Sequence, residues 1–182
     1  MAPSPFDVLS TDRLVLRRLR DEDAPALCAY RSDPEVARFQ GWGASFGEMQ
    51  ARSLIEAMRE REPGEEGWFQ FAVAECASGV LIGDLGLCAF GERQAEIGFT
   101  LARAAQGRGY AREAVSALLS YAFGPLHLHR VVAGIDPRNT KARALLERLK
   151  FRLEGRFVES FLEGNVWLDE DRFALLSREW TA

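Results

Sequence analysis

The chain has 182 residues, of which 47% are hydrophobic, and a formal net charge of −4. This length and apolar content suffice for one sizeable core and give no sign of a second, so we expect a single domain over residues 1–182. The charge is small and there is no basic tract, which argues against a nucleic-acid partner. No apolar run approaches the roughly 20 residues that span a bilayer, so we expect no membrane association.

The three cysteines favour a reducing compartment. Cys28, Cys76 and Cys88 cannot all pair with one another, and their spacing is not that of metal ligands. The N-terminus has no basic-then-apolar signal segment. The sequence therefore predicts a cytoplasmic protein without a bound metal.

The first sixty residues predict one strand and then helices. Residues 14–19 have a strand-like pattern, and a helix is expected at about 23–30 with Asp21 as its N-cap. Ser45 and Glu48 have the spacing of a capping box. The helix that they would open has an apolar stripe at helical spacing, formed by Ala51, Leu54, Ile55 and Met58.

Three strand-like runs follow at 68–74, 80–87 and 95–101. The connections between them are short, so neighbouring runs are expected to pair in antiparallel fashion. In the third run Ile97, Phe99 and Leu101 alternate onto one face, which is the period of a strand.

The turn Gln106-Gly107-Arg108-Gly109-Tyr110-Ala111 comes directly after the third run and opens an amphipathic helix. The first N–H groups of a helix have no partner within it, and the helix dipole adds positive charge there. This turn predicts a site for a phosphorylated cofactor. A dinucleotide fingerprint would need a third glycine where Arg112 stands, and a Walker loop would need a lysine, whereas the chain's only lysines are Lys141 and Lys150.

The last third of the chain alternates strands and helices. A helix over about 111–122 is followed by a strand at 131–135, which should run parallel to 97–101 because a helix connects them. A second helix is expected after Asn139, with Ala142, Leu145, Leu146 and Leu149 facing inward. Strands at 156–162 and 171–176 complete the predicted order.

The turn and its flanks resemble the GNAT acetyltransferase superfamily, whose pyrophosphate loop has the pattern Gln/Arg-x-x-Gly-x-Gly/Ala. Gln106, Gly109 and Ala111 match it. Segments 11–17, 30–36 and 128–131 are similar to the RimJ/RimL-like branch, which acetylates protein N-termini and other amines. The resemblance implies a mixed α/β fold of order β-α-α-β-β-β-α-β-α-β-β, with a central parallel strand pair that splays apart.

The cofactor implied by the resemblance is acetyl-CoA. Its pantetheine arm would pair with Phe99, Thr100 and Leu101, as an added strand does. The backbone of the turn would bind its pyrophosphate, which makes cofactor contacts of Gln106, Gly107, Arg108, Gly109, Tyr110 and Ala111. Asn139 lies where the family has an asparagine that reaches the pantetheine, and it also suits a helix cap.

The resemblance also implies the chemistry. A deprotonated amine would attack the thioester directly in a ternary complex, so a general base is the main requirement. Glu96 is the first candidate and Glu159 the second. The family's usual general acids, a serine or a tyrosine, are replaced by Ala142 and Leu146. A non-catalytic acyl-CoA-binding module of the same fold is therefore an alternative.

The acceptor amine would be bound by the variable N-terminal part of the chain. Phe39 and Trp42 lie between glycines and polar residues after an early helix, and their rings suit the wall of a pocket for an amine or an aliphatic chain. Relatives often pair through their C-terminal strands, so a homodimer is possible.

Overall fold

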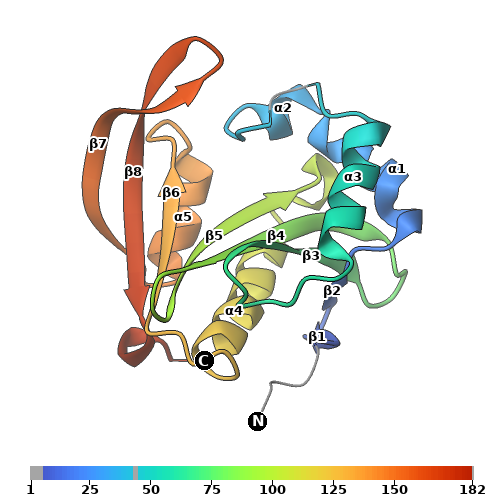
Figure 1. Cartoon of the computed structure of the whole chain (residues 1–182), viewed down its shortest axis with the longest axis horizontal. Helices are drawn as coiled ribbons and strands as arrows, with labels where there is room; N and C mark the ends of the chain where they lie inside the picture. The colour runs from blue at the N-terminus through green and yellow to red at the C-terminus, as the bar shows by residue number, and fades with distance from the viewer. Residues whose placement is uncertain (1–5, 43–44, 182) are drawn as a thin grey trace.

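The computed structural model describes residues 6–42 and 45–181. Its strands form one eight-stranded mixed sheet in the order β1-β2-β3-β4-β5-β6-β8-β7 (Figure 1). The strands are β1 (Val8–Ser10), β2 (Leu14–Arg18), β3 (Gly67–Glu75), β4 (Leu81–Phe90), β5 (Gln94–Leu101), β6 (Arg130–Ile135), β7 (Arg152–Glu163) and β8 (Val166–Leu176). The helices are α1 (Ala24–Arg31), α2 (Pro34–Ala37), α3 (Glu48–Met58), α4 (Tyr110–Phe123) and α5 (Thr140–Arg148).

This order confirms the predicted fold and adds one short edge strand, β1. The three central strands β3, β4 and β5 are antiparallel neighbours, as expected from their short connections. β5 and β6 run parallel, because α4 carries the chain back between them. The last strand, β8, lies between β6 and β7, which leaves β7 at the edge of the sheet.

Alternation along the central strands separates the two faces of the sheet. Phe69, Leu87 and Ile97 lie side by side on one face, and all three are buried. This face packs against the apolar stripe of α4, which includes Ala114, Val115, Leu118, Leu119 and Ala122. The opposite face is covered at one end by α1 and α3, which form a second, smaller core (Figure 1).

Two predicted N-caps are wrong. The N-cap of α3 is Gly47, not Ser45: the Gly47 N–H donates to Oε1 of Gln50 at 3.1 Å, which closes the first turn from within the helix. Asp21 does not cap α1 either. The carboxylate of Asp23 accepts the Arg20 N–H at 2.8 Å and thereby fixes the entry to the helix.

The predicted separation of the parallel pair is present. β5 and β6 are in register only over Gln94↔Arg130, Ala95↔Val131 and Glu96↔Val132. Beyond Glu96 the two strands diverge, which Figure 1 shows as a V that opens between them. The remainder of β5, from Ile97 to Leu101, has no strand on its β6 side, so its backbone there is open to a ligand.

Candidate functional site

A cavity of about 500 Å³ lies at the opening between β5 and β6. Its walls come from β3, β4 and β5, from the turn between β6 and α5, from residues 38–42, and from the β7–β8 hairpin. The hairpin closes it from above: the aromatic ring of Phe161 comes within 3.6 Å of the position where a Cβ atom would stand on Gly41. Segments far apart in sequence therefore enclose one space.

The floor of the cavity is the face of the sheet opposite α4. Strand register places Trp68, Cys88 and Glu96 in one row across β3, β4 and β5. The next row holds Gln70, Gly86 and Gly98, and the row after it Ala72, Asp84 and Thr100. The two glycines leave room for Trp68, because a Cβ atom on Gly86 would lie 2.8 Å from Cζ3 of its indole.

Glu96 stands at the last residue pair before the strands diverge. Its side chain is partly buried and lines the cavity, and it forms no ion pair with any residue that the structure describes. Burial raises the pKa of this carboxyl; the positive charge of Arg172 opposes the rise and the negative charge of Glu170 adds to it. A carboxylate with a raised pKa is a stronger base than an exposed one.

A buried ion pair supports the opposite end of the floor. Asp84 accepts hydrogen bonds from the Tyr30 hydroxyl at 2.6 Å and from Nη2 of Arg31 at 2.5 Å. With its amide turned so that the nitrogen faces Asp84, Gln70 donates a further hydrogen bond at 3.0 Å. Arg31 and Asp84 are almost fully buried, so each needs the other to stay charged. No pattern in the sequence indicates this pair, because it joins residues 53 positions apart.

The two aromatic residues predicted for the acceptor both line the cavity. The Trp42 ring lies 4.0 Å from the Arg31 guanidinium, and its Nε1 donates to the Arg31 carbonyl at 3.2 Å. Trp42 therefore also anchors the ion pair. Phe39 is half-buried nearby. Trp68 and Phe161, which the sequence analysis did not single out, add two further aromatic walls.

Carboxylates dominate the charged lining of the cavity. Among the described residues six acidic side chains reach it: Asp84, Glu96, Asp136, Glu163, Asp169 and Glu170. Only two arginines line it, Arg31 and Arg38. Asp84, Asp136 and Glu170 are each paired with an arginine, which leaves three carboxylates of the six without an ion pair to a described residue. Unpaired carboxylates around a partly enclosed space attract cations. The sequence could not show this cluster, because the six residues come from four separate strands and one loop.

The glycine turn has the geometry expected of an anion site. Gly107 and Gly109 have φ angles of 76° and 81°, in the left-handed region that favours glycine. Within residues 6–42 and 45–181, the N–H groups of positions 107–112 donate no recorded hydrogen bond, whereas the Gln106 N–H already donates to the Arg103 carbonyl. The residues present fit a pyrophosphate group.

Side chains from other elements hold this turn in place. Arg13 donates to the Glu113 carboxylate through Nε at 2.7 Å and to the Arg108 carbonyl through Nη1 at 3.0 Å. Burial opposes ionisation of Glu113, but hydrogen bonds from Thr11 and Arg13 prevail and lower its pKa. The Gln106 amide donates to the Leu101 carbonyl at 3.1 Å, which ties the turn to the end of β5.

The remaining predicted cofactor residues lie near one another. Phe99 and Thr100 line the cavity from β5, and Leu101 is buried beside them. Asn139 also lines it, and its side chain caps α5 by accepting the Ala142 N–H at 3.1 Å. Its expected capping role is thus present in the structure. Tyr110 is buried, with its hydroxyl 3.0 Å from Glu75, so only its backbone is available to a ligand.

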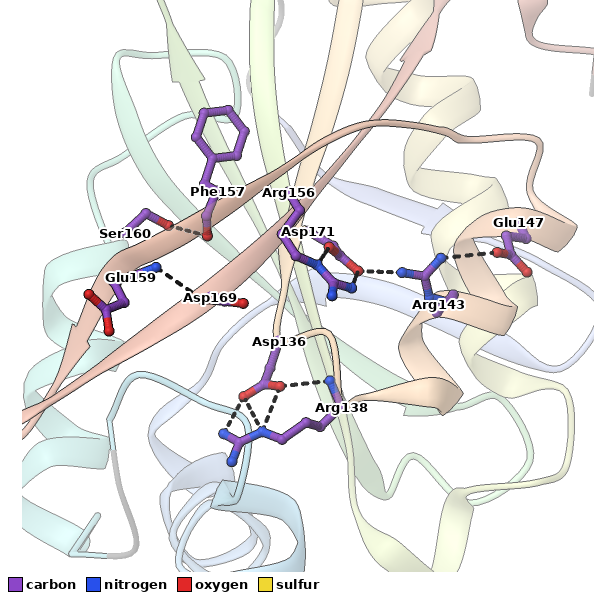
Figure 2. A network of polar contacts seen from close by, with 10 residues as sticks. All are labelled: Asp136, Arg138, Arg143, Glu147, Arg156, Phe157, Glu159, Ser160, Asp169 and Asp171. Carbon is purple, nitrogen blue, oxygen red and sulfur yellow. Dashed lines mark hydrogen bonds and ion pairs between the residues drawn. The ribbon is translucent and has the colours of Figure 1, made fainter.

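Glu159 lies apart from the other candidates. It is exposed, does not line the cavity and has a φ of 48° within a bulge of β7, where its N–H donates to Asp169 (Figure 2). The hairpin that carries it is fixed from the other side by Asp171. This fully buried carboxylate accepts hydrogen bonds from Arg156 of β7 and Arg143 of α5 (Figure 2).

Two further findings concern metals and membranes. Over the described ranges, no group of three or more His, Cys, Asp or Glu side chains is arranged to hold a metal ion. No helix in the same part of the chain has the length and apolar character needed to cross a membrane.

Comparisons with known proteins agree on one family. The model of the "Acetyltransferase (GNAT) domain" matches residues 13–152. An uncharacterized N-acetyltransferase p20 of Bacillus licheniformis is 35% identical to this chain over 96% of its length and 99% of the relative's. A ribosomal protein uS5-alanine N-acetyltransferase of Escherichia coli is 28% identical over 95% of this chain and 92% of its own.

Solved structures agree as well. The crystal structure of a GNAT-family acetyltransferase from Bacillus anthracis superposes with a TM-score of 0.86 at 30% identity, covering 94% of this chain and 99% of the other. Mycobacterium smegmatis RimJ, solved in complex with CoA-disulfide, has the same fold with a TM-score of 0.82 at 24% identity, covering 99% of this chain and 89% of its own.

Proposed function

Since the chain belongs to the GNAT acetyltransferase family and is an N-acetyltransferase, we propose that it acetylates a cationic primary amine with acetyl-CoA as the donor. The observation that carries this proposal is the position of Glu96. Glu96 is the last residue of β5 in register with β6, is partly buried, and forms no ion pair with any residue that the structure describes. The catalytic base would stand where the thioester is expected to end.

The donor would lie along the open edge of β5. The unpaired N–H groups of Gly107, Arg108, Gly109, Tyr110 and Ala111 would bind the pyrophosphate, and the edge formed by Phe99, Thr100 and Leu101 would pair with the pantetheine arm. Gln106 would act through its side chain, which sets the start of the turn. Asn139 faces the same cavity from the other side.

Glu96 would supply the proton chemistry. It takes one proton from the acceptor's ammonium group, which breaks an N–H bond and forms an O–H bond on the carboxylate. The neutral amine then attacks the carbonyl of the bound thioester, and the acetyl–nitrogen bond replaces the acetyl–sulfur bond. The nitrogen loses its second proton to the departing thiolate, so the products are the amide and the CoA thiol. Thiols have a pKa near 8.5, so the thiolate leaves without strong acid assistance. This suits a cavity where Ala142 takes the place of a serine and Leu146 is buried in the core.

The walls of the cavity favour an acceptor that arrives as a cation. Carboxylates outnumber arginines there, and rings of Phe39 and Trp42 face the same space. The Escherichia coli relative acts on an alanine of a ribosomal protein. A protein N-terminus or a small amine of this kind, carrying one ammonium group, fits the chemistry of this cavity.

A thiol-release assay tests this function. The wild-type protein is incubated with acetyl-CoA and either an alanyl peptide amide or 1,4-diaminobutane, and free CoA is measured across pH 5–9. We expect release that depends on the amine and that falls roughly 100-fold or more in Glu96→Gln, with unchanged CoA affinity. Glu159→Gln should retain wild-type rates. Full activity in Glu96→Gln together with loss in Glu159→Gln would move the base to β7.

We also propose that the protein forms a homodimer through the β7–β8 hairpin. Large apolar side chains of the hairpin are exposed: Leu153, Phe157, Val158, Phe161, Leu162, Val166 and Trp167. β7 is an edge strand of twelve residues, and such edges associate unless they are covered. Light scattering should give twice the chain mass for the wild type and a lower mass for Trp167→Glu.

The cysteines support a cytoplasmic setting, which we propose with the function. Cys28, Cys76 and Cys88 are all unpaired, and Cys76 is exposed. Exposed free thiols persist in reducing compartments and are lost to oxidation elsewhere.

A further inference from the structure

The side chain of Glu170 packs against the backbone of β6 at Gly134, a position that has no side chain. It lies on β8, diagonal to Gly134 of β6, whose direct partner is Arg172. A Cβ atom built on Gly134 would stand 2.7 Å from Cδ of Glu170 and closer still to Oε1. The carboxylate therefore rests directly on the β6 backbone, and only glycine at position 134 allows this.

One oxygen of this carboxylate is engaged and the other is not. Oε2 accepts hydrogen bonds from Nε and Nη2 of Arg172, at 3.1 and 2.5 Å. Oε1 has no hydrogen-bond donor among the residues that the structure describes. The two hydrogen bonds from Arg172 fix the orientation of Glu170, so that an acceptor atom remains for a ligand in the cavity that Glu170 lines.

Glu170 and Glu96 stand on opposite sides of the separation between β5 and β6. Gly134 lies two residues beyond Val132, the last β6 residue in register with β5, and Val132 pairs with Glu96. The two carboxylates line the same cavity and are close enough for the charge of Glu170 to act on Glu96. The other charged or titratable groups that act on Glu96 are Arg172 of β8 and Cys88 of β4.

We propose that Glu170 is the second carboxylate of the acceptor site, which binds the ammonium group of the amine through Oε1 while Glu96 removes a proton from it. This rests on the proposed function. The hydrogen bonds from Arg172 to Oε2 leave Oε1 of Glu170 as the atom that meets the cation. Of the two protons that the nitrogen loses, the first ends on Glu96 and the second on the departing thiolate, which makes Glu170 a residue that selects and orients the cation.

The arrangement divides two tasks between two like groups. A lone Glu96 would have to attract the cation and also accept its proton. With Glu170 holding one N–H, the nitrogen that Glu96 deprotonates is fixed relative to the thioester, and its lone pair forms in position for attack. The negative charge of Glu170 also keeps Glu96 more basic, since ionised carboxylates near one another oppose each other's ionisation.

Two variants test Glu170 by different routes. Glu170→Gln removes the charge and keeps the shape, whereas Gly134→Ala displaces the carboxylate and keeps the charge. Only the flexible end of one side chain meets the new methyl group, so the Gly134→Ala protein should fold. The matched control is Glu92→Gln, which removes one carboxylate from the exposed turn between β4 and β5. All three are assayed with acetyl-CoA and the alanyl peptide amide from pH 5 to 9.

We expect Glu170→Gln to raise KM for the amine about tenfold or more and to leave KM for acetyl-CoA unchanged. The acidic limb of its kcat/KM profile should move to lower pH, because Glu96 loses a like charge and Arg172 loses its partner. Gly134→Ala should also raise KM for the amine and move the acidic limb of the kcat/KM profile to lower pH. The double variant should equal Glu170→Gln alone, since the methyl group has nothing left to displace.

The possible outcomes distinguish a failure of this proposal from a failure of the proposed function on which it rests. If the wild type releases CoA and depends on Glu96, but Glu170→Gln has the amine KM and pH profile of Glu92→Gln, then Glu170 has no role at the acceptor and the proposal is overturned. If no amine in the panel is acetylated, the function itself fails. The proposal is then judged by the carboxyl ¹³C titration of Glu96, whose pKa must fall in Glu170→Gln; an unchanged pKa overturns it.

Discussion

Replacing Gly109 with valine should weaken cofactor binding strongly and leave the fold intact. Gly109 is the N-cap of α4 at φ 81°, a conformation that costs a residue with a side chain about 1–2 kcal/mol. A β-branched residue relieves this strain by leaving the left-handed region, which moves the N–H groups of Tyr110 and Ala111 that follow. Its Cβ would also stand 3.4 Å from Nη2 of Arg13, which holds the turn.

The two effects have different sizes. Backbone strain of about 1–2 kcal/mol lowers the Tm of a protein of this length by roughly 2–8 °C, which is small against total stabilities of 5–15 kcal/mol. Loss of one or two charge-assisted hydrogen bonds to the pyrophosphate costs about 2–3 kcal/mol, or roughly 30- to 150-fold in Kd. Gly109→Val should therefore weaken CoA binding strongly while the protein remains folded.

Gly91→Val is the matched control. Gly91 also has a positive φ, of 52°, but lies in the turn between β4 and β5 with nothing within 4 Å of its Cβ position. Thermal unfolding should show similar losses of Tm in the two variants. Calorimetric titration with CoA should show wild-type affinity in Gly91→Val alone. Equal CoA affinity in both variants would refute the assignment of the pyrophosphate to this turn.

Three more outcomes are expected. The kcat/KM of the wild type should rise with pH through a pKa above the ordinary value for glutamate, because burial raises that of Glu96, and Glu96→Gln should lose this limb; an identical limb would rule out Glu96 as base. Arg31→Met leaves Asp84 buried and unpaired, so urea unfolding should show a loss of about 3–5 kcal/mol, part of which Arg31→Met/Asp84→Asn recovers. Hydrogen bonds from Arg156 lower the pKa of Asp171, so its stabilising effect is present above pH of about 4 and disappears as pH falls through the lowered pKa. The difference in unfolding free energy between the wild type and Asp171→Asn should therefore be constant above that pH and narrow below it.

Local patterns in the sequence were sufficient for most of the fold. The period-two alternation of the central strands and the stripe of α4 each reflect a single buried face, and such faces repeat within one element. The glycine turn was equally legible, since its left-handed φ angles require residues without a side chain. The helix N-caps were harder to predict from the sequence. Ser45 had the right spacing, but the backbone of Gly47 and the amide of Gln50 close the turn two residues later.

The acceptor side of the site could not be read in this way. Arg31 and Asp84 become partners only because α1 packs over β4, and Glu170 reaches Gly134 only because β8 lies next to β6. Neither contact leaves a periodic signal, since each depends on how distant elements are placed. Glycines paired across strands, such as Gly86 and Gly98, were the one available hint that something large lies on that face.

The short register between β5 and β6 has a consequence for the order of events in catalysis. Three residue pairs, at Gln94–Glu96, are all that joins the two strands, and the rest of the sheet on either side is continuous. A pantetheine arm paired with β5 would fill the gap between β5 and β6. It would thereby complete the surface against which the amine binds. We therefore expect acetyl-CoA to enter before the amine and CoA to depart after the product, so that CoA inhibits competitively against acetyl-CoA and non-competitively against the amine.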